Sequence, residues 1–195
     1  MERKAFGLVG PISSGIWVVF DYLKEQGYHY YSLSDDLRAD PLAKQKRSGV
    51  TEREHWGWVG NTLRTQQGTD ILARKALERV FNEARPKIII DSIRHPDEVR
   101  YIQSQIEGIV MIGMNAPVRA RHKLSILRGR VVDPVDFEEF RRLDRGEFNG
   151  GDSAAQDINA ALKLVDILFR HRADNEEALG RLRRRVVRRL TSLAA

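Results

Sequence analysis

Short apolar runs alternate along this chain with longer stretches in which apolar residues recur every three or four positions. The short runs predict β-strands and the longer periodic stretches predict helices. Two of the runs, at 88–90 and 109–112, are continuously apolar, which is typical of parallel strands that are buried on both faces. The expected strands cover residues 5–9, 28–33, 87–91, 109–114 and 165–169.

The expected helices lie between these strands. They cover residues 16–26, 52–65, 70–84, 96–105, 117–128, 134–145, 154–164 and 175–193. Alternation of this kind predicts an α/β fold, with a five-stranded parallel sheet, right-handed crossovers and helices on both faces. The polar stretches 40–49 and 146–153 predict loops, the second because of its Gly150-Gly151 pair.

The size and composition are those of one folded domain that spans residues 1–195. A chain of 195 residues with 42% hydrophobic residues can bury a sizeable core. No apolar run approaches the roughly 18 residues that a membrane helix needs, and no secretory signal is visible. The absence of cysteine excludes disulfides and thiolate chemistry. We expect a cytoplasmic protein without a membrane partner.

The formal charge of +6 is concentrated near the end of the chain. The segment from Arg181 to Arg189 is far more basic than the rest, and without it the chain is close to neutral. Apolar residues recur through this segment at helical spacing, which predicts an amphipathic helix with an outward arginine face. Two interpretations stay open: a solvated face, or contact with nucleic acid or an acidic partner.

A glycine-rich segment follows the first predicted strand and opens a helix. Gly10 and Gly15 have the spacing of a phosphate-binding loop, in which the second glycine is followed by lysine and then serine or threonine. Here Ile16 and Trp17 stand in those two places, so the Walker A motif is degenerate.

Such a loop can hold an anion through main-chain amides alone, and the small residues Ser13 and Ser14 permit it. The expected nucleotide-binding positions are Gly10, Ser13, Ser14, Gly15, Ile16 and Trp17. Without the lysine charge and the hydroxyl ligand for magnesium, we expect ATP-driven catalysis to be lost or weakened. The alternative is a tight strand-to-helix turn, with Ile16 and Trp17 in the core.

Several further segments match one family in order. Residues 31–38 (YSLSDDLR) resemble an SLSDxLR segment, residues 60–68 (GNTLRTQQG) a GNxLRxxxG segment, and residues 91–99 (DSIRHPDEV) a DGIRxPxEV segment in which Ser92 replaces glycine. RGR at 128–130 and DP at 133–134 resemble a lid, and residues 156–158 and 165–168 resemble a closing helix and last strand. From about residue 4 to 187 the chain resembles the P-loop nucleoside monophosphate kinases, in particular the adenylate-kinase-related and dephospho-CoA-kinase-like branch.

The resemblance implies an organisation as well as a fold. It implies an acceptor-side insertion at about 35–68, a lid at about 128–147 and a C-terminal helix at about 175–193. It also implies that Asp35, Arg38, Arg64 and Arg94 lie at the acceptor nucleotide, with the arginines on its phosphate. For Arg38 and Arg64 the alternative is a solvated loop or helix-face charge.

Asp91 and the lid arginines are the expected catalytic residues. Asp91 ends an apolar strand, at the edge of an open α/β sheet where ligands bind, and the resemblance places it near magnesium or the acceptor. Arg128 and Arg130 would close over the phosphates. We expect Arg128, Arg130 or Lys123 partly to replace the missing loop lysine. Arg121 lies seven residues before Arg128 and so on the same helix face.

The histidines and tryptophans carry less information. The five histidines do not pair at helical spacing, so no metal site is expected from them. Trp56 and Trp58 flank Gly57 in the acceptor-side segment, where they would stack on a base or pack under the lid.

Three functions remain open from the sequence. The first is transfer of a phosphoryl group from ATP, with Mg²⁺, to a nucleoside or deoxynucleoside monophosphate. The second is a catalytically inactive pseudokinase that senses a monophosphate or acts as a partner subunit. This function is slightly favoured because the acceptor-side residues match the family better than the phosphate-binding loop does. The third is a nucleic-acid-associated protein that uses the arginine-rich tail.

Overall fold

A parallel sheet forms the centre of the molecule. The computed structural model describes residues 4–45, 47–130, 133–148 and 153–194. Within them, five strands pair in the order β2-β3-β1-β4-β5, and every pairing is parallel. The strands are β1 (Lys4–Val9), β2 (His29–Ser32), β3 (Lys87–Ile93), β4 (Val110–Asn115) and β5 (Ile167–Arg170). The predicted α/β fold with a five-stranded parallel sheet is confirmed.

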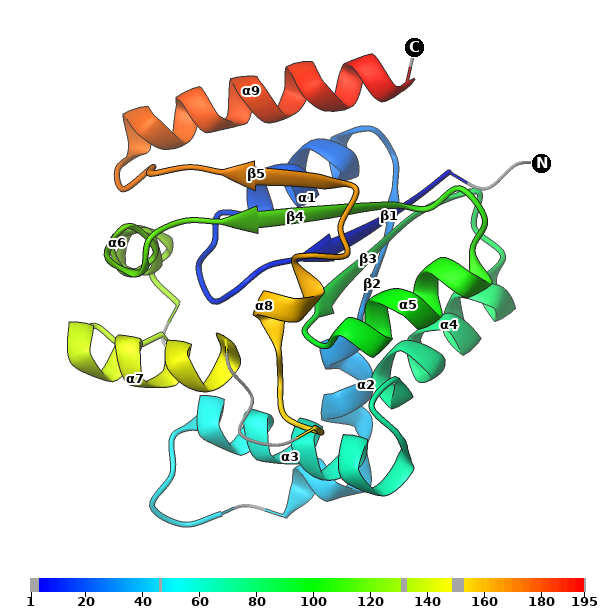
Figure 1. Cartoon of the computed structure of the whole chain (residues 1–195), viewed down its shortest axis with the longest axis vertical. Coiled ribbons are helices and arrows are strands. Elements are labelled where there is room, and N and C mark those ends of the chain that lie inside the picture. The colour runs from blue at the N-terminus through cyan, green and yellow to red at the C-terminus, as the bar shows by residue number, and fades with distance from the viewer. Residues whose placement is uncertain (1–3, 46, 131–132, 149–152, 195) are drawn as a thin grey trace.

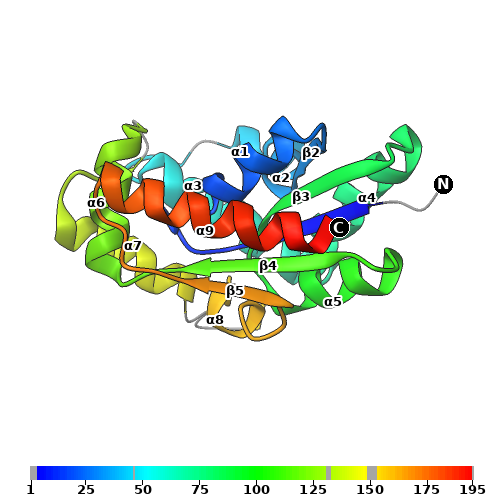
Figure 2. The same cartoon turned by 90° about the horizontal axis from the view of Figure 1, so that it is seen from above.

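The helices cover both faces of the sheet (Figures 1 and 2). They are α1 (Trp17–Glu25), α2 (Leu33–Ala39), α3 (Glu52–Gln67), α4 (Ile71–Glu83), α5 (Pro96–Gln105), α6 (Val118–Arg128), α7 (Phe137–Phe148), α8 (Ile158–Ala161) and α9 (Glu176–Ala194). A 3₁₀ turn, Pro41–Lys44, lies in the stretch predicted to be a loop. None of these helices is both long and apolar enough to cross a membrane.

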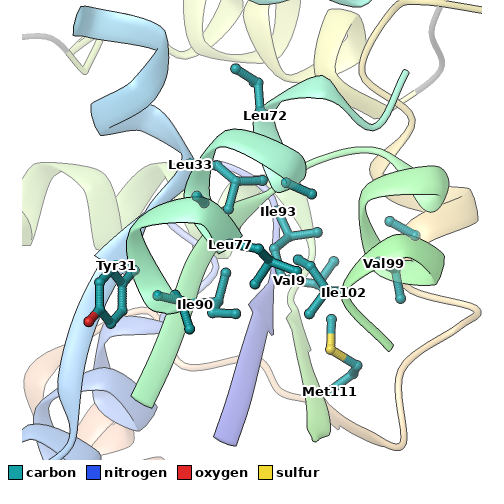
Figure 3. Close-up of a cluster of buried hydrophobic side chains, with 14 of the residues drawn as sticks. Val9, Tyr31, Leu33, Leu72, Leu77, Ile90, Ile93, Val99, Ile102 and Met111 are labelled. Atoms are coloured by element: carbon teal, nitrogen blue, oxygen red, sulfur yellow. The ribbon is translucent and has the colours of Figure 1, made fainter. Parts of the chain in front are cut away.

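Apolar side chains on the two faces of the sheet form two core clusters. On one face, Ile90 and Met111 pack with Leu77 of α4 and Ile102 of α5 (Figure 3). On the other, strand residues including Ile112 pack against α1 and α9. The continuous apolar runs in β3 and β4 are therefore buried on both sides, as their composition predicts.

Helix α9 is attached by one apolar face. Its residues Leu182, Val186 and Leu190 are buried, whereas its arginines are exposed. Each fully buried aliphatic side chain contributes about 1.5–3 kcal/mol, so this face holds the helix along the sheet (Figure 2).

Three helices of the structure differ from the prediction. Helix α2 was not expected; its start is fixed by the Ser32 hydroxyl, which accepts the Ser34 amide at 3.2 Å. The helix predicted at 154–164 is only the short α8, which begins where the Asp157 side chain accepts the Ala160 amide at 2.9 Å. Helix α7 continues through Phe148 into the predicted loop 146–153, because residues such as Leu143 and Glu147 remain on its buried face. The pair Gly150-Gly151 lies outside the described residues.

Candidate functional site

A cavity of about 500 Å³ opens at the carboxyl ends of the strands. The loop after β1 forms one wall, and α2 and α3 form another. Residues at the end of β3 also line it, as do Arg128, Arg130, Asp133, Glu147 and Gln156. This is the edge at which open α/β sheets bind their ligands.

The loop between β1 and α1 presents a row of main-chain amides. Ser13 (φ 52°) and Gly15 (φ 83°) are in the left-handed region, which turns successive N–H groups to one side. Within the described residues, the N–H groups of positions 13, 15, 16 and 17 donate to no protein acceptor. The Ser14 side chain is buried and its hydroxyl has no partner either. These groups form a concave set of unpaired donors.

Gly10 is required by the close packing of this loop. A Cβ at this position would lie 2.6 Å from the Ser14 Oγ and 3.0 Å from the Met114 carbonyl oxygen. Opposite, His171 Nε2 donates to the Ser14 carbonyl at 2.7 Å, while its Nδ1 accepts the Ala173 amide at 3.1 Å. Burial lowers the pKa of His171, so the neutral ring holds the back of the loop. Sequence reasoning missed this role because no local pattern marks it.

Two carboxylates lie against the loop. Glu147 Oε2 accepts the Ile12 amide at 3.1 Å, and the Ser13 hydroxyl donates to Asp133 Oδ2 at 3.5 Å. Arg53 bridges them, with Nη1 3.0 Å from Glu147 Oε1 and Nη2 bound to Asp133. Arg94 Nη1 also donates to Glu147, at 2.7 Å.

Glu147 is therefore held as an anion. Burial would raise the pKa of its carboxyl, but Arg94, Arg53 and the Ile12 amide outweigh that effect and keep the pKa below its ordinary value. Arg94, a predicted phosphate ligand, lines the cavity while paired with this carboxylate. The residues Arg53 and Glu147 were not among the predicted site residues, and Asp133 appeared only within the lid motif.

Arg64 lines the cavity from a buried position. Its Nε and Nη2 donate to Glu98 Oε1 at 3.1 and 2.7 Å, and both side chains are almost fully buried. Among the residues that the structure describes, its Nη1 atom has no partner. Because the other oxygen of Glu98 accepts the amides of Arg94 and His95, the carboxylate is fixed, and it holds the guanidinium in place.

The other two acceptor-side residues are more exposed. Arg38 lines the cavity with its guanidinium 5.8 Å from the centre of the Trp56 ring. Asp35 forms a 3.6 Å ion pair with Arg38, but it does not line the cavity. The structure thus brings Arg38, Arg64 and Arg94 to one cavity and leaves Asp35 at its margin.

Asp91 also faces the cavity, beside a strained residue. Its Oδ2 accepts the Tyr30 hydroxyl at 3.0 Å. Burial, and then the charge of Asp91, raise the pKa of Tyr30, so this phenol remains a donor. Ser92 has φ 66°, where a non-glycine residue costs roughly 1–3 kcal/mol. Glycine, the residue that the resembling segment has at that place, adopts this conformation without such a cost. β3 continues beyond Asp91 to Ile93, two residues further than predicted.

Four of the cations in and just after α6 have different positions. Arg128 and Arg130 line the cavity, and the Arg128 guanidinium lies 4.7 Å from the centre of the Trp17 ring. Lys123 instead forms an exposed ion pair with Asp174 at 2.8 Å, away from the cavity. Arg121 is buried against Asp144 and donates to the Ile12 carbonyl at 3.3 Å, so it supports the loop from behind.

Ile16 and Trp17 are partly buried and pack against the core between the sheet, α1 and α9, as the alternative interpretation of the loop expects. Both also line the cavity. Their side chains contribute neither a cation nor an oxygen ligand.

The fold is that of the P-loop kinases. A protein of Thermus thermophilus has a TM-score of 0.55 at 17% identity, over 97% of this chain and 99% of that one. Shikimate kinase from Acinetobacter baumannii has a TM-score of 0.52 at 15% identity, over 97% and 94% of the two chains. Dephospho-CoA kinase from Campylobacter jejuni has a TM-score of 0.50 at 12% identity, over 99% and 100%. At these identities the likeness shows the fold alone.

The chain belongs to the UPF0200 family. It is 32% identical to the UPF0200 protein of Methanothrix thermoacetophila over 130 residues, which cover 67% of this chain and 69% of that protein. The UPF0200 protein of Methanoculleus marisnigri is 25% identical over 181 residues, covering 92% and 93%. No protein-family model matches the chain.

Proposed function

We propose that this protein binds a nucleoside or deoxynucleoside monophosphate in the cavity, and that it acts as a nucleotide sensor or partner subunit of the kinase-like fold. The carrying observation is a set of polar groups that have no partner among the described residues and that belong to residues lining one cavity: the loop amides, the Ser14 hydroxyl and the Arg64 Nη1. Buried donors without acceptors are costly, and a phosphate supplies the acceptors that they lack. A volume of about 500 Å³ is also within the usual range for small-ligand sites.

The remaining lining fits the rest of such a ligand. The rings of Trp56 and Tyr30 offer apolar faces to a base or sugar, and Arg38 and Arg94 add positive charge. Arg38 and Arg94 lie in segments that resemble the nucleoside monophosphate kinases, as does Arg64, which supports a monophosphate as the ligand.

The loop does not fit a magnesium–triphosphate complex of the usual kind. Position 16 offers an aliphatic side chain and position 17 an indole, so the loop provides neither the ammonium group nor the hydroxyl ligand that such a complex uses.

Thermal unfolding with added nucleotides tests the proposal. A ligand at 100 times its dissociation constant stabilises by about 2.7 kcal/mol, which raises the melting temperature of a domain of this size by about 5–11 °C. We expect this rise with at least one monophosphate and little or none with magnesium-ATP. If no monophosphate raises the melting temperature, the proposal is wrong.

Phosphoryl transfer from ATP to the monophosphate is a second candidate, favoured by one observation. Asp91, Arg128 and Arg130 line the same cavity as the loop, as the resemblance expects of catalytic residues. Chromatography of each monophosphate incubated with magnesium-ATP tests it: formation of diphosphate that depends on Asp91 supports an enzyme.

The outer face of α9 favours contact with nucleic acid or an acidic partner. Arg184, Arg188 and Arg189 are exposed and form no ion pair within the described part of the chain. A row of unpaired guanidinium groups on a rigid helix is the charge arrangement that phosphate backbones attract.

A further inference from the structure

The two unusual residues of the loop are accompanied by an unusual contact. Trp17 begins α1, where a phosphate-binding loop has its hydroxyl residue. Arg128 ends α6, and its guanidinium lies over the Trp17 ring at 4.7 Å from the ring centre. The flat guanidinium is well suited to stacking on an indole.

Within the described residues, Arg128 and Arg130 differ from the other arginines that line the cavity, because neither forms an ion pair with a carboxylate. Of these two, Arg128 is the one that lies over the Trp17 ring. Arg53, Arg64, Arg94 and Arg121 each form an ion pair with a carboxylate. Within the residues that the structure describes, Arg128 forms none, although it is half-buried and lines the cavity. Burial, and then the charge of Arg130, lower its pKa, but a guanidinium stays charged in proteins.

We propose that Arg128, held on the indole of Trp17, supplies the charge that the loop lysine would supply, so that the loop binds a phosphate group without a divalent metal ion. This proposal rests on the proposed function and deepens it. Trp17 is then a positioning residue. It stands where the hydroxyl ligand of the metal would be, and its ring provides the surface on which Arg128 lies.

The chemistry of the loop and of Arg128 supports the replacement of the lysine by this arginine. The loop amides donate hydrogen bonds but carry no net charge, so a bound phosphate needs a cation nearby. Arg128 offers N–H groups in a fork that matches two phosphate oxygens. Ile16, at the position of the lysine, packs against the apolar core instead.

Calorimetric titration of the whole protein with inorganic pyrophosphate tests the proposal. We expect equal or tighter binding in EDTA than in magnesium chloride. Arg128→Ala should weaken binding about tenfold to a hundredfold, the effect of losing a charged hydrogen bond. Trp17→Ala should weaken it in the same direction although it removes no phosphate-contacting cation, and Trp17→Phe, which keeps an aromatic face, should restore most of the affinity.

Lys123→Ala is the matched control, because this cation is on the same helix but pairs with Asp174 outside the cavity. Its affinity for pyrophosphate should equal that of the wild type. Circular dichroism checks that each variant is folded; should Trp17→Ala not fold, Arg128→Ala and Trp17→Phe still decide the matter.

Several results would overturn the proposal: binding that requires magnesium, wild-type affinity in Arg128→Ala, or no binding of pyrophosphate by a protein that binds monophosphates. In each case the proposed function would stand. If the wild-type protein binds neither pyrophosphate nor any monophosphate, the proposed function itself fails.

Discussion

The ion pair between Arg64 and Glu98 allows a test of whether a buried carboxylate holds the Arg64 guanidinium in the cavity wall. Glu98 is fully buried and accepts four hydrogen bonds, two from the Arg64 guanidinium and two from the amides of Arg94 and His95. In Glu98→Gln the side chain keeps its shape but loses its charge and one of its acceptor oxygens. The Arg64 cation is then buried without a counter-charge.

Leaving one partner of a buried ion pair unpaired costs about 3–5 kcal/mol. For a chain of 195 residues, a change of this size lowers the melting temperature by roughly 6–20 °C. The assay is urea unfolding followed by circular dichroism, with thermal unfolding as a second measurement. Two-state fits should give an unchanged m-value and a lower midpoint.

Glu107→Gln is the control. Glu107 is exposed and lies just beyond the end of the same helix, α5, so its substitution should change the free energy of unfolding by less than about 0.5 kcal/mol. A loss of less than about 1 kcal/mol in Glu98→Gln would refute the account of Arg64 as a cation fixed by a buried partner.

Three further outcomes follow from single contacts. Gly10→Ala should abolish nucleotide-induced stabilisation, because the new Cβ lies 2.6 Å from the Ser14 hydroxyl; an unchanged thermal shift would count against the loop as the binding element. The pKa of His171 is lowered from 6.5 in the folded protein, so its stabilising contribution is complete above that pH and decreases as the pH falls. Between pH 7.5 and 5.5 the wild type should therefore lose more stability than His171→Gln; equal losses would contradict this. Arg184→Ala with Arg188→Ala should lower the salt concentration that elutes the protein from immobilised DNA; retention that does not depend on these arginines would favour a solvated face.

The strands of the sheet could be predicted from the sequence because each is marked by a short apolar run within the strand itself. The apolar run at 88–90 can only be buried on both sides, and a strand of this kind belongs in a parallel sheet. The loop after β1 was recognisable because its glycines are close together in the chain. Helix α2 was missed because it is short, with only Leu33 and Leu37 as buried apolar positions, and because its start depends on the cap by Ser32.

The electrostatics of the cavity could not be predicted in the same way. Glu147 meets the Ile12 amide across 135 residues of sequence, and Arg53 meets Glu147 across 94. No local pattern reports such a pairing. The position of Arg64 in the cavity agrees with the resemblance, but its partner Glu98 lies 34 residues further along the chain, in α5, and no local pattern pairs the two.

A crystal structure of the protein with the monophosphate that binds most tightly tests the central claim most directly. We predict that the phosphate lies in this cavity and accepts hydrogen bonds from the loop amides and the Ser14 hydroxyl, or from the Arg64 Nη1. A phosphate bound outside the cavity, or a cavity in which these groups remain unpaired with the ligand present at saturation, would contradict the account.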